Sequence, residues 1–146
     1  MNVLFLCTGN YYRSRFAEEY FNARARSKGL LHRAFSRGLS KNFERLKNPG
    51  PMSFDALSEL RKCGVIVRKP IRKPQMLSGT EVGFFDMIIC MDKKEHRPMV
   101  KKRLSLKNRA VIYWKIKDLS ELSASKALPE CKQKIDALIQ TLADLP

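Results

Sequence analysis

Two residues able to do chemistry, Cys7 and Arg13, stand six positions apart near the start of the chain. An apolar run, residues 2–6, precedes them, and a helical pattern begins just after them. A strand, a short loop containing glycine and a helix N-terminus together bind anions, because the backbone N–H groups and the helix dipole point toward the same place. The spacing therefore predicts a phosphate site with a nucleophilic thiolate behind it.

Each residue type in this segment has a use in phosphoryl chemistry. A cysteine beside a guanidinium at a helix N-terminus is more readily a thiolate. Arg13 can bind two phosphate oxygens with its planar fork, which a lysine lacks. Ser14 can donate a hydrogen bond to the Cys7 sulfur, and Gly9 and Asn10 tolerate the positive φ that a tight loop needs. We expect the phosphate to be bound by Thr8, Gly9, Asn10, Tyr11, Tyr12, Arg13 and Ser14.

Strand and helix patterns alternate along the rest of the chain. We expect strands at residues 2–7, 32–36, 85–91 and 109–116. We expect helices at residues 14–28, 54–63, 92–102 and from Pro129 onward, with a short one at 78–83. Crossover units of this kind are right-handed and imply a parallel sheet covered on both faces.

Composition narrows the class of protein. A chain of 146 residues is expected to form one domain, residues 1–146, and no stretch approaches the about 20 apolar residues that span a bilayer. The N-terminus lacks a secretory pattern, so we expect a cytoplasmic protein. The four cysteines form no closely spaced pair, so we expect neither zinc nor disulfides, no cofactor, and buried thiols at Cys63, Cys90 and Cys131.

The formal net charge of +15 is unusual for a chain of this length. Basic residues gather at 68–73 and at 101–103. Such a charge favours a polyanionic ligand: nucleic acid, an acidic protein or an anionic membrane surface. The alternative is a solvated basic surface without a dedicated ligand, because no nucleic-acid motif accompanies the charge.

The segment resembles the signature of the low-molecular-weight protein tyrosine phosphatase family, a strand followed by C-x-G-N-x-C-R-S and a helix containing A-E. Three later segments resemble family motifs in the same order: Ser36-Arg37-Gly38, Pro51-Met52, and the run from Phe85 to Asp92. The resemblance implies a flavodoxin-like three-layer α/β sandwich, with a four-stranded parallel sheet in the order 2-1-3-4 and helices on both faces. It also implies a phosphatase that works through a cysteinyl phosphate.

A proton donor for the leaving oxygen is also needed. The family uses an Asp in a D-P motif after the fourth strand, and that position here gives Asp118, followed by Leu119. Asp118 is therefore the expected catalytic acid beside Cys7 and Arg13. The other acids close by, Glu121 and Glu130, fit the end of the strand less well.

Several residues depart from the family pattern. Tyr12 replaces its second cysteine, which removes the protective disulfide and leaves Cys7 more open to overoxidation. Tyr11 narrows the mouth of the site, where a small Thr goes with phosphoarginine substrates in the family. Arg15 replaces a Pro and should add positive charge beside the site, and Pro70 stands where many members have a His.

The acid loop lacks the aromatic residues that flank a phosphotyrosine ring, and Tyr11 or Phe43 is a candidate to supply that wall. The sequence thus predicts a protein phosphatase, most readily for phosphotyrosine, with phosphorylated proteins as partners and the oligomeric state left open. The alternative is a non-catalytic phosphate-binding module that docks on nucleic acid or phosphoproteins. Arsenate reduction, which shares this fold, passes a disulfide from the loop cysteine to two further cysteines spaced seven positions apart. Cys90 could be one of the two, but the position of the other is Arg97, so this reaction is disfavoured.

Overall fold

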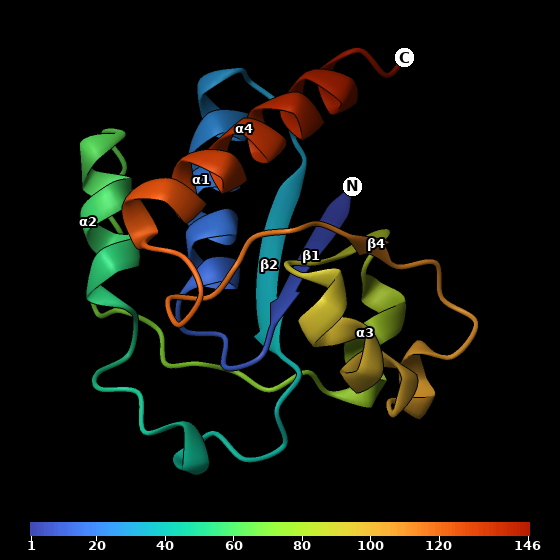
Figure 1. Ribbon diagram of the computed structural model, residues 1–146. Coiled ribbons are helices and arrows are strands. Elements are labelled where there is room, and N and C mark those ends of the chain that lie inside the picture. The colour runs from blue at the N-terminus through green and yellow to red at the C-terminus, as the bar shows by residue number, and fades with distance from the viewer.

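A four-stranded parallel sheet forms the centre of the computed structural model, which describes residues 1–146 (Figure 1). The strand order is β2-β1-β3-β4, and all three pairings are parallel, which confirms the predicted topology. The strands are β1 (Asn2–Cys7), β2 (Arg33–Gly38), β3 (Met87–Cys90) and β4 (Ile112–Tyr113).

Helices cover both faces of the sheet. α1, α2 and α4 pack together on one face, and α3 lies on the other with two short helical turns, η2 and η3 (Figure 1). The α-helices are α1 (Arg13–Ser27), α2 (Phe54–Lys62), α3 (Lys93–Lys101) and α4 (Ala124–Ala143). The 3-10 turns are η1 (Glu44–Leu46), η2 (Gly79–Phe84) and η3 (Leu104–Leu106). No helix is both long enough and apolar enough to cross a membrane.

The central strand β1 supplies both cores, because successive side chains of a strand point to opposite faces. Val3, Phe5 and Cys7 belong to the core beneath α1, α2 and α4, whereas Leu4 and Leu6 belong to the core on the α3 side. All five side chains are buried. The nucleophile candidate is thus the last residue of the most buried strand.

Two predicted elements have the wrong length. β4 has two residues rather than the predicted eight, because it is an edge strand whose regular pairing with β3 covers only Ile112 and Tyr113. Beyond it, Trp114 and Ile116 donate single hydrogen bonds to Cys90 and Met91 without continuing the strand. α4 begins at Ala124 rather than Pro129, and the proline lies inside the helix with its ring exposed. Buried Ala127 and Leu128 extend the apolar stripe of α4 ahead of Pro129, and packing of this stripe outweighs the cost of the proline.

The carboxyl ends of the strands bring three loops to one edge of the sheet. The loop after β1 leads into α1, the residues after β3 begin α3, and the segment after β4 carries Asp118. In open α/β sheets this edge is where ligands bind. Residues 7, 95 and 118, far apart in sequence, line a common hollow there.

Candidate active site

The phosphate loop, residues 7–14, curls around a hollow of about 310 Å³. Asn10 has a φ of 50°, as predicted for a tight turn. The backbone N–H groups of Thr8 to Ser14 have no hydrogen-bond acceptor within the protein. Unpaired buried donors are costly, so a loop of this shape is stabilised by an anion that accepts from several of them. We call this cavity the phosphate hollow; its lining is Cys7, Thr8, Gly9, Tyr11, Tyr12, Arg13, Leu46, Asn48, Glu95, Asp118 and Leu119.

The Cys7 sulfur has a directed hydrogen-bond donor. Its Sγ lies 2.9 Å from the Ser14 hydroxyl oxygen, as the sequence predicted. The Asn10 amide donates to the same hydroxyl oxygen at 3.0 Å. Because that oxygen already accepts from Asn10, its own proton is free to point at the sulfur. A hydrogen bond in this direction stabilises negative charge on the sulfur when Cys7 acts as a leaving group.

A buried polar network holds the phosphate loop from beneath. The Asn10 amide also donates to Ser36 Oγ at 2.8 Å, and its Oδ1 accepts from Arg72 at 3.1 Å and from the Gln75 N–H at 2.9 Å. Arg72 in turn pairs with Glu18 at 3.2 Å. The sequence did not point to Arg72, which belongs to a basic loop 62 positions from Asn10.

Gly9 serves the loop through its small size rather than its conformation. Unlike Asn10, it does not have a positive φ, so that part of the prediction was wrong. A Cβ atom at Gly9 would come within 2.9 Å of Leu46 Cδ1. Leu46 and Asn48 form a wall of the phosphate hollow that the sequence did not reveal.

The Arg13 guanidinium is held by a bidentate ion pair with Glu95. Its two terminal nitrogens lie 2.7 and 3.0 Å from the Glu95 carboxylate oxygens, and Nη1 also donates to the Ile116 carbonyl at 3.1 Å. Burial alone would lower the pKa of Arg13, but the hydrogen bond to Glu95 and the neighbouring negative groups raise it. Arg13 is therefore a fixed positive charge.

Glu95 is the main site residue that the sequence did not suggest. Its Oε2 also accepts from Thr8 Oγ1 at 2.5 Å and lies 3.1 Å from His96 Nε2. The Asp92 N–H donates to His96 Nδ1, which leaves the proton of a neutral ring on Nε2. Burial alone would raise the pKa of Glu95, but bonds from His96, Arg13 and Thr8 hold it well below its usual range. A substrate phosphate and this carboxylate compete for the same Arg13 nitrogens.

Asp118 lines the phosphate hollow from the opposite side. Its Oδ1 lies 4.0 Å from Arg13 Nε, and its side chain is 45% exposed. The Asp118 carbonyl accepts from the N–H groups of Glu121 and Leu122, which fixes the turn. Neither Glu121 nor Glu130 lines this hollow. Of the three acids considered, the structure thus brings only Asp118 to the phosphate loop.

Of the residues that depart from the family pattern or could supply an aromatic wall, only some line the phosphate hollow. Arg15 is 1% exposed, donates to the Pro51 carbonyl and does not line the phosphate hollow. Burial, aided by Arg72, lowers its pKa to about 10 and outweighs the nearby groups that raise it, Cys7 among them. Tyr11 lines the hollow and donates to the Pro49 carbonyl, whereas Phe43 lies outside this lining.

The replacement of the second cysteine by Tyr12 leaves a buried phenol at the site. Tyr12 lines the phosphate hollow, and its hydroxyl has no hydrogen-bond partner. Burial, with the charge of Asp55 nearby, raises its pKa. Tyr12 is therefore a neutral wall of the hollow and not an acid or base.

The remaining thiols do not reach the site. Cys90 and Cys131 are buried as predicted, and burial raises the pKa of the Cys90 thiol to about 12. Cys63 is partly exposed, so its predicted burial was wrong; it lies at the end of α2. No group of three or more His, Cys, Asp or Glu side chains is arranged to hold a metal ion.

Comparisons with known proteins identify the family of the chain. A model of the family described as low molecular weight phosphotyrosine protein phosphatase matches residues 2–127. A search of curated proteins found no match.

Solved structures share the fold over nearly the whole chain. A low molecular weight protein tyrosine phosphatase from T. tengcongensis is 22% identical with a TM-score of 0.72, covering 99% of this chain and 98% of that one. A protein tyrosine phosphatase from Entamoeba histolytica is 16% identical with a TM-score of 0.79, covering 100% and 97%. An arginine phosphatase from Geobacillus stearothermophilus is 19% identical with a TM-score of 0.76, covering 97% and 92%.

Proposed function

The chain belongs to the low molecular weight phosphotyrosine protein phosphatase family, and from that premise we propose that it hydrolyses protein phosphotyrosine through a cysteinyl-phosphate intermediate. The observation that carries the proposal is the position of Cys7, whose sulfur lies in a hollow ringed by unpaired backbone N–H groups. We treat residues 1–146 as one phosphatase domain. The four free thiols support the cytoplasmic location predicted from the sequence.

The first step is transfer of the phosphoryl group to sulfur. The phosphate binds the N–H groups of the loop and Arg13, displacing Glu95 from part of the guanidinium. The Cys7 thiolate attacks phosphorus, the bond to the leaving oxygen breaks with its electron pair, and Asp118 gives that oxygen a proton. The loop N–H groups and Arg13 stabilise the charge on the equatorial oxygens.

The second step regenerates the enzyme. A water attacks the phosphorus of the cysteinyl phosphate, and Asp118, now ionised, takes its proton. The sulfur–phosphorus bond breaks, and the electron pair returns to the Cys7 sulfur. The Ser14 hydroxyl, 2.9 Å away, stabilises the departing thiolate by donating a hydrogen bond.

The walls of the phosphate hollow support an aryl substrate. Tyr11, Tyr12 and Leu119 line it, and the phenyl ring of a phosphotyrosine buries apolar area against such side chains. Phosphoarginine is the competing substrate, because the structures with this fold include arginine phosphatases. The bulk of Tyr11 at the mouth argues against it.

A non-catalytic phosphate-binding module is the second candidate. The observation that favours it is the bidentate hold of Glu95 on Arg13, which keeps the guanidinium occupied by the protein itself. In that case the phosphate loop would bind a phosphorylated partner without turnover.

The test compares the wild-type protein with Cys7→Ser on an aryl phosphate and on phosphotyrosine, phosphoserine, phosphoarginine and inositol phosphate substrates. We expect hydrolysis that is fastest for phosphotyrosine and is lost in Cys7→Ser, while a matched Cys63→Ser variant remains active. Full activity of Cys7→Ser would disprove the mechanism. If both proteins bind inorganic phosphate but neither turns over, the non-catalytic alternative is correct.

A further inference from the structure

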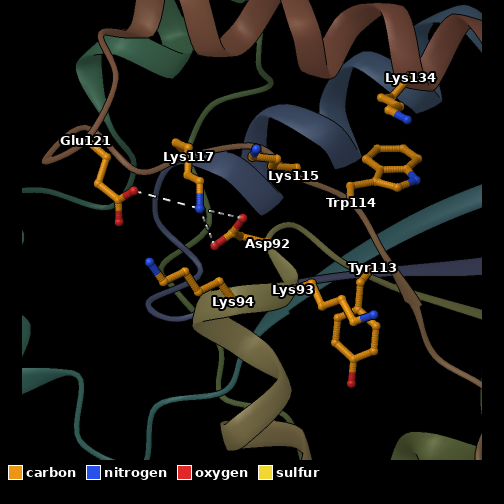
Figure 2. Close-up of a pocket in the computed structure, with 9 residues that line it drawn as sticks. All are labelled: Asp92, Lys93, Lys94, Tyr113, Trp114, Lys115, Lys117, Glu121 and Lys134. Carbon is orange, nitrogen blue, oxygen red and sulfur yellow. Dashed lines mark hydrogen bonds and ion pairs between the residues drawn. The ribbon is translucent and has the colours of Figure 1, made fainter.

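A second hollow, of about 710 Å³, lies beside the phosphate hollow and shares no lining residue with it (Figure 2). Figure 2 shows its walls coming from the start of α3, the segment after β4, and α4. We call it the lysine hollow; its lining is Asp92, Lys93, Lys94, Tyr113, Trp114, Lys115, Lys117, Glu121 and Lys134.

Positive charge in the lysine hollow is mostly uncompensated. Lys117 is neutralised, because its ammonium lies 3.1 Å from Asp92 and 3.7 Å from Glu121. The other four lysines, Lys93, Lys94, Lys115 and Lys134, are exposed and have no carboxylate within 4.0 Å. Ammonium groups gathered around one concave surface create a positive potential that attracts a ligand with several negative charges.

The lysine hollow adjoins the site of phosphoryl chemistry. Lys117, on its wall, directly precedes Asp118 in the phosphate hollow. Asp92 caps α3 by accepting from the N–H of Glu95, which holds Arg13. The two hollows are therefore joined through the same two elements, the start of α3 and the segment after β4.

We propose that the lysine hollow binds acidic side chains flanking the phosphorylated residue of a protein substrate. The proposal rests on the proposed function, because it extends the phosphate site to the neighbouring residues of the same substrate. Carboxylates suit this surface, because its cations are lysine ammonium groups, which act as separate point charges on flexible stems and can each pair with one acidic side chain.

A nucleic acid fits the lysine hollow less well. Binding of single strands depends on aromatic faces on which bases can stack. Trp114 is partly buried, and its ring packs against Phe5 with centroids 5.6 Å apart. Tyr113 is also partly buried and packs against the core on the α3 side. Neither ring is a free stacking platform.

The kinetic test uses two phosphotyrosine peptides of equal length, one with glutamates beside the phosphotyrosine and one with glutamines. We expect the wild-type kcat/KM to be about tenfold higher for the acidic peptide at low salt, and the preference to shrink as ionic strength rises. The triple variant Lys93→Gln, Lys115→Gln, Lys134→Gln should lose most of this preference.

A matched control variant distinguishes the effect of the lysine hollow from the effect of the protein's net charge. Lys28→Gln, Lys102→Gln, Lys107→Gln removes the same charge from exposed lysines that line neither hollow, and it should keep the acidic preference. Equal loss in both triple variants would mean that net charge alone attracts the substrate, and it would overturn the proposal.

A binding measurement keeps this proposal separate from catalysis. An unphosphorylated, fluorescein-labelled glutamate-rich peptide is titrated with the wild-type protein and with both triple variants, and its anisotropy is recorded. Trp114 is the only tryptophan of the chain, so a change in its emission locates the bound peptide at the lysine hollow. This result does not depend on turnover, and it stands even if the protein proves not to be a phosphatase.

Three outcomes of the titration decide the matter. Binding that is weakened several-fold only by the Lys93, Lys115, Lys134 variant supports the proposal. Binding equally affected in both variants contradicts it. Tighter binding of a single-stranded oligonucleotide of equal charge, lost in the same hollow variant, would assign the surface to nucleic acid instead.

Discussion

The phosphate loop, residues 7–14, is held by the protein interior, whereas the segment that carries Asp118 lies at the surface. Asn10 and Ser14 are fully buried, and the Asn10 side chain bonds to two other parts of the chain, Ser36 in β2 and the segment 72–75. The Asp118 side chain is 45% exposed, and its only recorded partner is Arg13, at 4.0 Å. The half of the site that we propose binds phosphate is thus fixed by the packed interior, whereas the half that we propose transfers protons lies on a short exposed turn.

The largest effect should come from the bidentate fork of the phosphate loop. Arg13→Lys keeps the charge but loses two parallel hydrogen bonds to the transition state, so kcat/KM for an aryl phosphate should fall about a thousandfold. Arg97→Lys, an exposed change on α3, is the control and should have no effect. A loss of less than tenfold would show that Arg13 serves Glu95 rather than the substrate.

The exposed half of the site should matter less for binding than for turnover. Asp118→Asn removes the proton donor, and kcat should fall about a hundredfold while the inhibition constant of inorganic phosphate stays unchanged. The loss should grow with the pKa of the leaving alcohol, which steady-state rates on a series of aryl phosphates measure. Glu121→Gln is the matched control, and an equal loss there would move the acid to that residue.

The hydrogen bonds of the Asn10 side chain beneath the phosphate loop should contribute to the free energy of unfolding. Asn10→Ala leaves the Gln75 N–H without its side-chain acceptor, takes one of several acceptors from the Arg72 guanidinium, and removes a residue that tolerates positive φ. We expect the free energy of unfolding to fall by about 2 kcal/mol, measured by denaturant titration. Ser120→Ala, on the exposed turn, should change the free energy of unfolding little. Comparable losses in the two variants would contradict the claim that the phosphate loop is held more firmly than the turn.

A substitution of Glu95 tests whether its carboxylate competes with phosphate for the Arg13 guanidinium. Glu95→Gln removes a negative charge that competes for Arg13, so the inhibition constant of inorganic phosphate should fall about fivefold. Glu59→Gln, in α2, is a charge-matched control. An inhibition constant that rises instead would mean that Glu95 positions Arg13 and does not compete with phosphate.

The same carboxylate should make the fold sensitive to acid. The pKa of Glu95 is lowered by folding, so its contribution to stability is present above its unfolded value of about 4.3 and is lost as the pH falls toward the folded pKa. The melting temperature of the wild type should therefore approach that of Glu95→Gln between pH 6 and pH 3 (roughly the window in which this group titrates in the unfolded chain). A constant difference across this range would contradict the assignment.

The sequence pattern predicted those features of the site that depend on residues close together in the chain. The spacing of Cys7, Ser14 and Arg13 predicted a loop that the structure contains, and the positive φ of Asn10 followed from its residue type. The contact between Glu95 and Arg13 was not predictable, because it joins residues 82 positions apart and no pattern marks such a pair. Resemblance to the family supplied the strand order, which periodicity alone left open.

Element boundaries failed where tertiary contacts override propensity. The apolar run around Ile112 reads as a long strand, but only two of its residues pair with β3 at the edge of the sheet. Pro129 reads as a helix start, yet the apolar stripe of α4 extends past it on both sides. In both cases the partner surface, and not the segment itself, decided the length.

The central position of β1 determines which parts of the protein unfold first on heating. Its amide groups are hydrogen-bonded to strands on both sides, and its side chains fill both cores. Hydrogen exchange at Leu4 and Leu6 therefore requires opening of the whole sheet, whereas the turn after Asp118 can fray on its own. On gentle warming, proton transfer should fail before phosphate binding does, and the protein should pass through a state that still holds its ligand without turning it over.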